Sequence, residues 1–415
     1  MNPLSSALLR LPVTARDPAG EIETAALISL CIDAVHAWWS RQGHSRRVSK
    51  REGTVRRIER VDFVPTGPRP QAGCIVEIRA TGHSASDIEL ELRQAHAQEA
   101  FATSRITWHA PGGAGTTALV PVAFPADLPP PQVIRLMGSG DCDQAGHVNV
   151  QVFADLADSA LVALSEPDES PRQAHRLRPQ RLRISFRAEL FAGDLVQVCS
   201  AVTSTTPQQV STTHVVVNES TGEIACVMEA ESSLEAIGQR SPDAVKSLQS
   251  RLSDLAGDWS GLPGIKPPQG DRAALLPSDR AIETCRETVD SWDADESGLM
   301  SPRTLVRWCS TGARQFLAAI GLDGARFARD HCTVAAVDYL IDWPAQVNVG
   351  SNVLLRSALL DASAKSMRFV HYLMDADRGE VLARIEIVGV MFDLNARRSM
   401  EIPADVRARL DTVRA

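Results

Sequence analysis

The sequence predicts an α+β protein made of three tandem modules, each with one long helix wrapped by an antiparallel sheet. Two observations predict this fold class. The turn Asp-x-x-Gly precedes an apolar helical pattern at Asp17, Asp143 and Asp295, in the same register each time. After each helix come several segments of alternating apolar and polar residues, separated by turn residues, as sequential antiparallel strands require.

Each of the three predicted helices has an apolar face at equivalent positions. The face begins about ten residues after each Asp and continues at helical spacing for roughly three turns. Its equivalent first and last positions are Leu27, Phe153 and Leu305, and then Trp38, Leu164 and Phe316. A helix with such a face needs cover on most sides, and a curled antiparallel sheet supplies that cover.

The modules are expected at residues 1–112, 130–237 and 276–410, with linkers rich in Gly and Pro at 113–129 and 238–275. A short strand, Gln132–Met137, leads into the second helix. The strands expected after the helices of the second and third modules are Leu182–Phe191, Leu195–Thr203, Ser211–Val217, Ile224–Ser232, Val334–Trp343, Asn352–Leu360, Met367–Met374 and Val381–Phe392.

Composition narrows the class of protein. The formal net charge of −8 gives no global attraction to nucleic acid or to an anionic membrane, so neither is expected as a partner. Eight cysteines are scattered without a Cys-x-x-Cys pair or a Cys/His cluster at zinc spacing, which favours reduced thiols and no metal. No secretory signal or membrane span is recognisable, and we expect a cytoplasmic protein.

The second module carries the most specific motif. The stretch Gly140–Asn149 reads Gly-Asp-Cys-Asp-Gln-Ala-Gly-His-Val-Asn and runs directly into the predicted helix. It resembles the helix-opening motif of the 4-hydroxybenzoyl-CoA thioesterase family of hotdog proteins, in which a sheet wraps a central helix. The first and third modules are weaker matches, because Glu-Ile-Glu at 21–23 and Leu-Met-Ser at 299–301 replace His-Val-Asn.

The resemblance implies that Asp143 is a catalytic carboxylate, which attacks a thioester carbonyl or activates a water that does. Asp17 and Asp295 occupy the same position in the other modules. An Asp before a helix is also a common N-cap, and that structural role stays open for these two residues. Backbone amides from Gly146 to Val150, with Gly146 and Val150 as named candidates, would stabilise the oxyanion at the helix N-terminus.

Three further residues near the starts of the predicted helices have open roles. His147 would orient substrate or transfer a proton, or it simply packs beneath the helix. Asn149 is expected to cap the helix more than to do chemistry. Pro302 stands where the family's main oxyanion donor is expected in the third module, and proline has no N–H.

Arginines gather before the first strand that follows the helix in the first two modules. In the second module Arg178, Arg181 and Arg183 are candidates for binding the phosphates of CoA or an acidic acyl carrier protein. A solvated charged surface is the alternative. CoA or phosphopantetheine would arrive as part of the substrate, and no separate cofactor is expected.

The leading hypothesis is therefore an acyl-thioester hydrolase acting on acyl-CoA or acyl carrier protein substrates. A hotdog hydratase or dehydratase is an alternative, although Asp143 and His147 do not have the spacing typical of those enzymes. A non-catalytic acyl-thioester binding scaffold is the other. Hotdog modules generally pair and three modules cannot all pair within one chain, so we expect a homodimer or another even-chain assembly.

Overall fold

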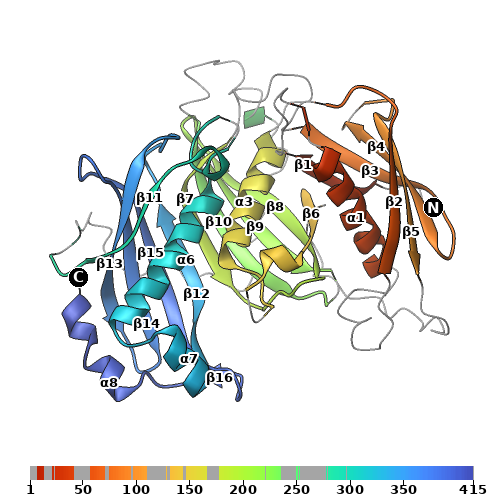
Figure 1. Ribbon diagram of the computed structural model, residues 1–415. Coiled ribbons are helices and arrows are strands. Elements are labelled where there is room, and N and C mark those ends of the chain that lie inside the picture. Colours follow the sequence, from red (N-terminus) through yellow and green to blue (C-terminus); the bar gives the residue numbers. More distant parts are fainter. Residues whose placement is uncertain are drawn as a thin grey trace.

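The computed structural model gives the arrangement of the helices and strands shown in Figure 1. The structure describes residues 7–13, 21–22, 24–41, 57–70, 74–94, 97–109, 128, 131–143, 146–165, 177–219, 221–234, 249–250, 252, 277, 279–295 and 297–414. Asp17 and most of the two expected linkers lie outside these ranges.

The elements fall into three consecutive sets, each a strand, a long helix and four more strands. The first set contains β1 (Ala7–Val13), α1 (Thr24–Arg41), β2 (Arg57–Pro65), β3 (Cys74–His83), β4 (Asp87–Gln94) and β5 (Ala102–His109). The second contains β6 (Val133–Leu136), α3 (Val150–Ser165), β7 (Pro179–Phe186), β8 (Leu195–Thr205), β9 (Gln209–Asn218) and β10 (Ile224–Ser233). The third contains β11 (Ile282–Thr288), α6 (Pro302–Ala319), α7 (Gly324–Asp330), β12 (Cys332–Asp342), β13 (Asn352–Ala362), β14 (Ser366–Asp375) and β15 (Val381–Asp393), followed by β16 (Arg398–Ser399) and α8 (Ala404–Arg407).

The strands of all three sets follow one order. The first sheet reads β1-β3-β4-β5-β2, and the larger sheet reads β11-β13-β14-β15-β12 followed by β7-β10-β9-β8-β6. Within each set the order is thus first, third, fourth, fifth, second strand. The ladders between these described strands are antiparallel, as sequential strands joined by short turns require.

The second and third sets are joined along one seam. Strand β7 pairs antiparallel with β12, from Ser185 opposite Asp338 to Arg181 opposite Asp342. Helices α3 and α6 lie side by side on one face of this continuous sheet, and their apolar residues share one core (Figure 1). Arg303 on α6 also donates to Asp155 on α3 at 2.8 Å, so the two sets form one packed body.

The first set has its own sheet and core. Helix α1 buries Leu27, Cys31 and Val35 against this sheet. Leu136 and Leu195 of the second set join the same apolar cluster, so the two cores meet where β1 lies against β6. In each set, then, an antiparallel sheet covers one long helix (Figure 1).

Most of the expected strands are confirmed to within a few residues, but two local predictions fail. The strand expected over Leu182–Phe191 ends at Phe186, because the amides of Arg187 and Ala188 both donate to the carbonyl of Ala225 and break the ladder. Helix α7 was not expected. Asp323 caps it by accepting from the Arg326 amide at 2.8 Å, and seven residues are too few for a periodic signal.

Candidate active site

Asp143 lies in a tight turn immediately before α3. Its amide donates to the carbonyl of His147 at 2.8 Å, and the Gly146 amide donates back to the Asp143 carbonyl at 3.0 Å. Gly146 has φ of +85°, a left-handed conformation that glycine adopts without steric cost. The His147 amide also donates to Oδ1 of Asp143 at 3.0 Å, so the turn holds the carboxylate against the backbone.

Asp295 forms the same turn before α6. Its amide donates to the Leu299 carbonyl at 2.8 Å, and Gly298, with φ of +79°, donates to the Asp295 carbonyl at 3.0 Å. The Leu299 amide lies 3.3 Å from Oδ1 of Asp295. Each helix begins at the same offset from its Asp, with α3 starting at Val150 and α6 at Pro302. The two turns are therefore equivalent in geometry as well as in sequence.

The two carboxylates differ in their surroundings. Asp143 is exposed, whereas the side chain of Asp295 is only 4% exposed and forms an ion pair with Arg178. Arg178 also donates to the hydroxyl of Ser297 in the same turn. Arg178 precedes β7 of the second set, so a residue of one set covers the Asp of the other. Solvent and substrate can reach Asp143 more readily than Asp295.

The backbone amides around Asp143 leave one oxyanion donor candidate. The four amides from Gly146 to Asn149 all donate to protein oxygens, namely to the Asp143 carbonyl, Asp143 Oδ1, the Leu190 carbonyl and the Asp141 carbonyl. Gly146 is therefore removed as an oxyanion donor in this conformation. The amide of Val150 remains, in the first turn of α3, where helical N–H groups have no intrahelical partner.

The third set lacks this donor. The four amides from Gly298 to Ser301 also donate to protein oxygens, to the Asp295 carbonyl, Asp295 Oδ1, the Val347 carbonyl and the Asp293 carbonyl. The next residue, Pro302, is the first residue of α6 and has no N–H. Ser301 caps the helix by accepting from the Thr304 amide at 3.2 Å. Pro302 is thus a structural helix starter and supplies no oxyanion donor.

His147 and Asn149 contact different parts of the site. The imidazole of His147 packs edge-on against Phe191, and its Nε2 lies 3.8 Å from Oε1 of Glu189. Glu189 in turn pairs with Arg397. Asn149 donates through Nδ2 to the Asp141 carbonyl at 3.0 Å, which ties the helix start to the preceding loop.

Glu189 and Arg397 are the residues that sequence reasoning missed. Arg397 follows β15 in the third set and has φ of +52°, so a strained turn carries its guanidinium to the second set. The two residues are separated by 208 positions, and no motif connects them. Only the docking of the second set on the third brings them together, beside His147.

The three arginines considered for phosphate binding have structural partners. Arg178 covers Asp295, as described above. Arg181 lies 3.3 Å from Asp342, and Arg183 lies 3.0 Å from Asp338. Because Asp338 and Asp342 lie on β12 and Arg181 and Arg183 lie on β7, these two ion pairs fasten the seam. They do not present an open basic patch.

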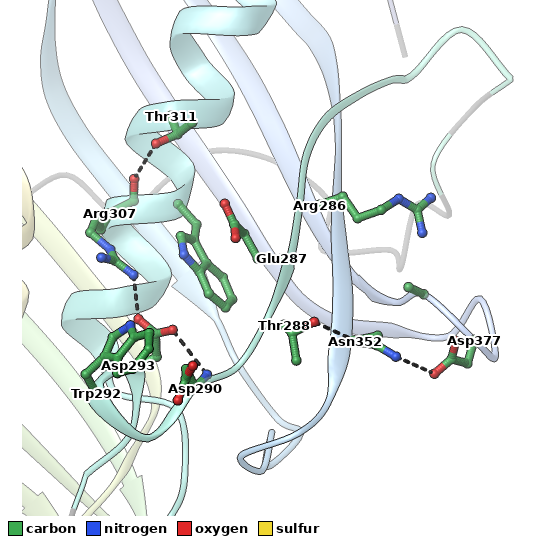
Figure 2. Close-up of a pocket in the computed structure, with 12 residues that line it drawn as sticks. Arg286, Glu287, Thr288, Asp290, Trp292, Asp293, Arg307, Thr311, Asn352 and Asp377 are labelled. Carbon is green, nitrogen blue, oxygen red and sulfur yellow. Dashed lines mark hydrogen bonds and ion pairs between the residues drawn. The ribbon is translucent and has the colours of Figure 1, made fainter.

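The structure also has a cavity of about 740 Å³, which lies in the third set between β11, α6 and the loop before α6 (Figure 2). Trp292, Arg307 and Glu287 are among its lining residues, whereas Asp143 and Asp295 are not. Among the described residues, no group of three or more His, Cys, Asp or Glu is arranged to hold a metal ion. Within the same ranges, no helix combines the length and the apolar character needed to cross a membrane.

Comparison with known proteins finds similarity to thioesterases. Residues 289–410 match the family model of the thioesterase-like superfamily. The matched region is the third set, although the second carries the fuller motif. A curated chloroplastic acyl-acyl carrier protein thioesterase of Arabidopsis thaliana is 21% identical over 121 residues, which is 29% of this chain and 63% of that protein. The chain thus spans less than two thirds of the length of this relative.

Solved structures of similar proteins have low sequence identity. A provisionally named oleoyl thioesterase from Lactobacillus plantarum is 13% identical, with a TM-score of 0.47, covering 64% of this chain and 97% of that one. The 12:0-acyl carrier protein thioesterase of Umbellularia californica is 12% identical, with a TM-score of 0.44, covering 62% of this chain and 92% of that one.

Proposed function

We propose that the protein is an acyl-thioester hydrolase built from three hotdog modules, in which Asp143 of the second module is the reactive carboxylate. The observation that carries this proposal is the contrast between two equivalent turns. Asp143 is exposed and α3 begins at Val150, which has an amide N–H. The side chain of Asp295 is 4% exposed and pairs with Arg178, and α6 begins at Pro302, which has no N–H. The thioesterase-like match of residues 289–410 supports the reaction class.

Asp143 would act in one of two ways. Its carboxylate attacks the thioester carbonyl carbon and the thiolate leaves, after which water hydrolyses the acyl-enzyme anhydride. Otherwise it takes a proton from a water that attacks the same carbon. In both cases the negative charge on the carbonyl oxygen is stabilised by the Val150 amide and the positive end of the α3 dipole. His147, beside Glu189, would in its protonated form donate a proton to the departing thiolate.

Acyl-CoA and acyl carrier protein esters are both proposed substrates, and CoA or phosphopantetheine enters as part of them. The curated relative acts on acyl carrier protein esters by its name, which makes that class the first to test. Because Arg178, Arg181 and Arg183 are engaged with acids, a phosphate-binding role for them would require these ion pairs to open. A cytoplasmic location remains part of the proposal.

Thiol release from a panel of acyl-CoA and acyl carrier protein esters tests the function. The wild-type protein should release thiol from at least one ester, and Asp143→Asn should lower the rate by about 10²–10⁴, as for a lost acid–base group. The matched control is Asp361→Asn, an exposed carboxylate on β13. Absence of thiol release from every ester would favour the acyl-binding scaffold. Hydration of an enoyl ester without thiol release would favour the hydratase.

A further inference from the structure

The first and second sets use matching surfaces to contact each other. Their first strands, β1 and β6, are both edge strands and lie against each other. Helix α1 contacts β6 and helix α3 contacts β1, so each set presents its first strand and its helix to the other (Figure 1). The contact is therefore reciprocal, as in a two-fold interface.

The third set has the same surface. Its first strand, β11, is the edge strand at the end of the larger sheet. Counting from the equivalent Asp residues, Glu287 stands at the position of Arg135 on β6, and Arg307 stands at that of Asp155 on α3. In the second set Arg135 donates to Asp155 at 2.7 Å and faces Asp33 of α1, at the boundary with the first set.

In the third set these positions line the 740 Å³ cavity (Figure 2). Thr311, at the position of Asp33, and Asp293, at the position of Asp141, are also lining residues. Trp292 lies on the loop beside them and is 76% exposed. In the second set the first set covers this surface. In the third set the equivalent surface is an open cavity, with the exposed indole of Trp292 at its edge.

We propose that this third-set face, formed by β11, Trp292 and the outward side of α6, binds the same face of a second copy of the chain. In this arrangement β11 lies beside β11 of the other copy, as β1 lies beside β6 within the chain. The result is a homodimer of six modules. The proposal identifies the surface of the even-chain assembly and does not depend on the hydrolase activity.

The charges of the face favour a second copy over an acidic carrier protein. Both signs are present, and the charged lining residues are Arg286, Arg307, Glu287, Asp290, Asp293 and Asp377. Asp293 pairs with Arg307 inside the chain and its side chain is 5% exposed, which leaves three carboxylates on the face. A two-fold axis brings groups of both signs from the two copies together, whereas an acidic partner would meet these three carboxylates. Tryptophan is also among the residues that most often dominate binding energy at protein interfaces.

Analytical ultracentrifugation of the full chain at about 10 µM tests the proposal. The wild-type protein should sediment as a particle of twice the chain mass of 44.9 kDa, and Trp292→Asp should shift it to a single chain mass. The control is Val64→Asp on β2, a residue that is 54% exposed and outside the face, which should leave the dimer intact. A wild-type monomer, or a dimer unchanged by Trp292→Asp, would overturn the proposal.

Two further variants test the same face and separate loss of the dimer from misfolding. Arg286→Glu alters the same face at a side chain that is 57% exposed, so a dissociated chain with native circular dichroism shows that dimer loss is not misfolding. Thr288→Cys on β11 should form an interchain disulfide under mild oxidation beyond the wild-type background. Binding of acyl carrier protein by a monomeric wild type, lost in Trp292→Asp, would assign the face to that partner instead. Thiol release is followed separately, so failure of the dimer and of the hydrolase are distinguishable.

Discussion

At the scale of single residues, Arg178 supplies the positive charge that pairs with the carboxylate of Asp295. Removing it leaves a carboxylate that is 4% exposed without its guanidinium partner. We expect Arg178→Ala to lower the free energy of unfolding by about 3 kcal/mol, because an uncompensated buried charge is costly. The double variant with Asp295→Asn should regain much of this loss. Urea unfolding of the two single variants and the double variant gives the coupling energy, and additive losses would show that the pair is not coupled.

Glu189 and Arg397 are expected to position His147. Arg397→Ala frees Glu189 from its partner in the third set and should lower kcat for thioester hydrolysis by about tenfold, less than loss of an acid–base group. Glu189→Gln should lower kcat by a similar factor, since it removes the carboxylate 3.8 Å from His147 Nε2. Arg398→Ala, at the exposed neighbouring residue, is the control. An unchanged kcat in Glu189→Gln would indicate a merely structural carboxylate.

At the scale of elements, two buried histidines make stability depend on pH. His214 on β9 bonds Ser200 on β8 at 2.8 Å, and His371 on β14 bonds Ser357 on β13 at 2.6 Å. Burial lowers the pKa of His214 to about 4 and that of His371 to about 3, from an ordinary value of 6.5. Above pH 6.5 both are neutral in the folded and unfolded chains. Below it the unfolded chain takes up protons that the folded chain does not, so stability falls towards pH 4.

Urea unfolding midpoints at pH 7.5, 6.0 and 5.0 measure this dependence. The wild-type midpoint should fall between pH 6.5 and 5, and His214→Leu should reduce the fall. His331→Leu, at an exposed histidine, serves as the control. If His214→Leu and the wild type lose stability in parallel, the histidine does not cause the loss.

Local pattern is enough to predict most elements. Alternating residues place β13, observed at Asn352–Ala362, within two residues of the expected strand. The Asp-x-x-Gly turns mark where α3 and α6 begin, because the turn geometry leads directly into the helix. The expected absence of an oxyanion donor in the third module rests on Pro302, and the structure puts this residue in the first helical position.

A local sequence pattern does not reveal which distant strands and side chains pair in the folded chain. The β7–β12 seam joins residues more than 150 positions apart, and it decides the partners of Arg178, Arg181 and Arg183. In the sequence these arginines resemble a phosphate-binding site, because the acidic residues that pair with them lie far away along the chain. For the same reason Arg397 gave no signal, since its relation to Glu189 exists only in the folded chain.

At the scale of the whole molecule, Asp33 links the first set to the second. Burial raises the pKa of Asp33 to about 7, with Arg135 opposing this shift and Asp141 adding to it. The folded chain therefore holds a proton that the unfolded chain releases near pH 4. The resulting stabilisation is present below pH 4 and is lost as pH rises through 7.

Asp33→Asn tests this contact between sets. The amide cannot ionise, so the stability of the variant relative to the wild type should be higher at pH 8 than at pH 5. Thermal unfolding at both pH values, with Asp361→Asn at an exposed carboxylate on β13 as the control, provides the comparison. A constant difference between Asp33→Asn and wild type across pH would mean that ionisation of Asp33 does not govern the contact.

The central claim is that Asp143, and not Asp295, is the reactive carboxylate. Comparing Asp143→Asn with Asp295→Asn in one thiol-release assay on the same ester tests it most directly. We predict that Asp143→Asn loses about 10²–10⁴ in rate, whereas Asp295→Asn keeps the rate within a few-fold. Full loss in Asp295→Asn with retained turnover in Asp143→Asn would contradict the assignment. The working site would then lie in the third set, beneath Arg178.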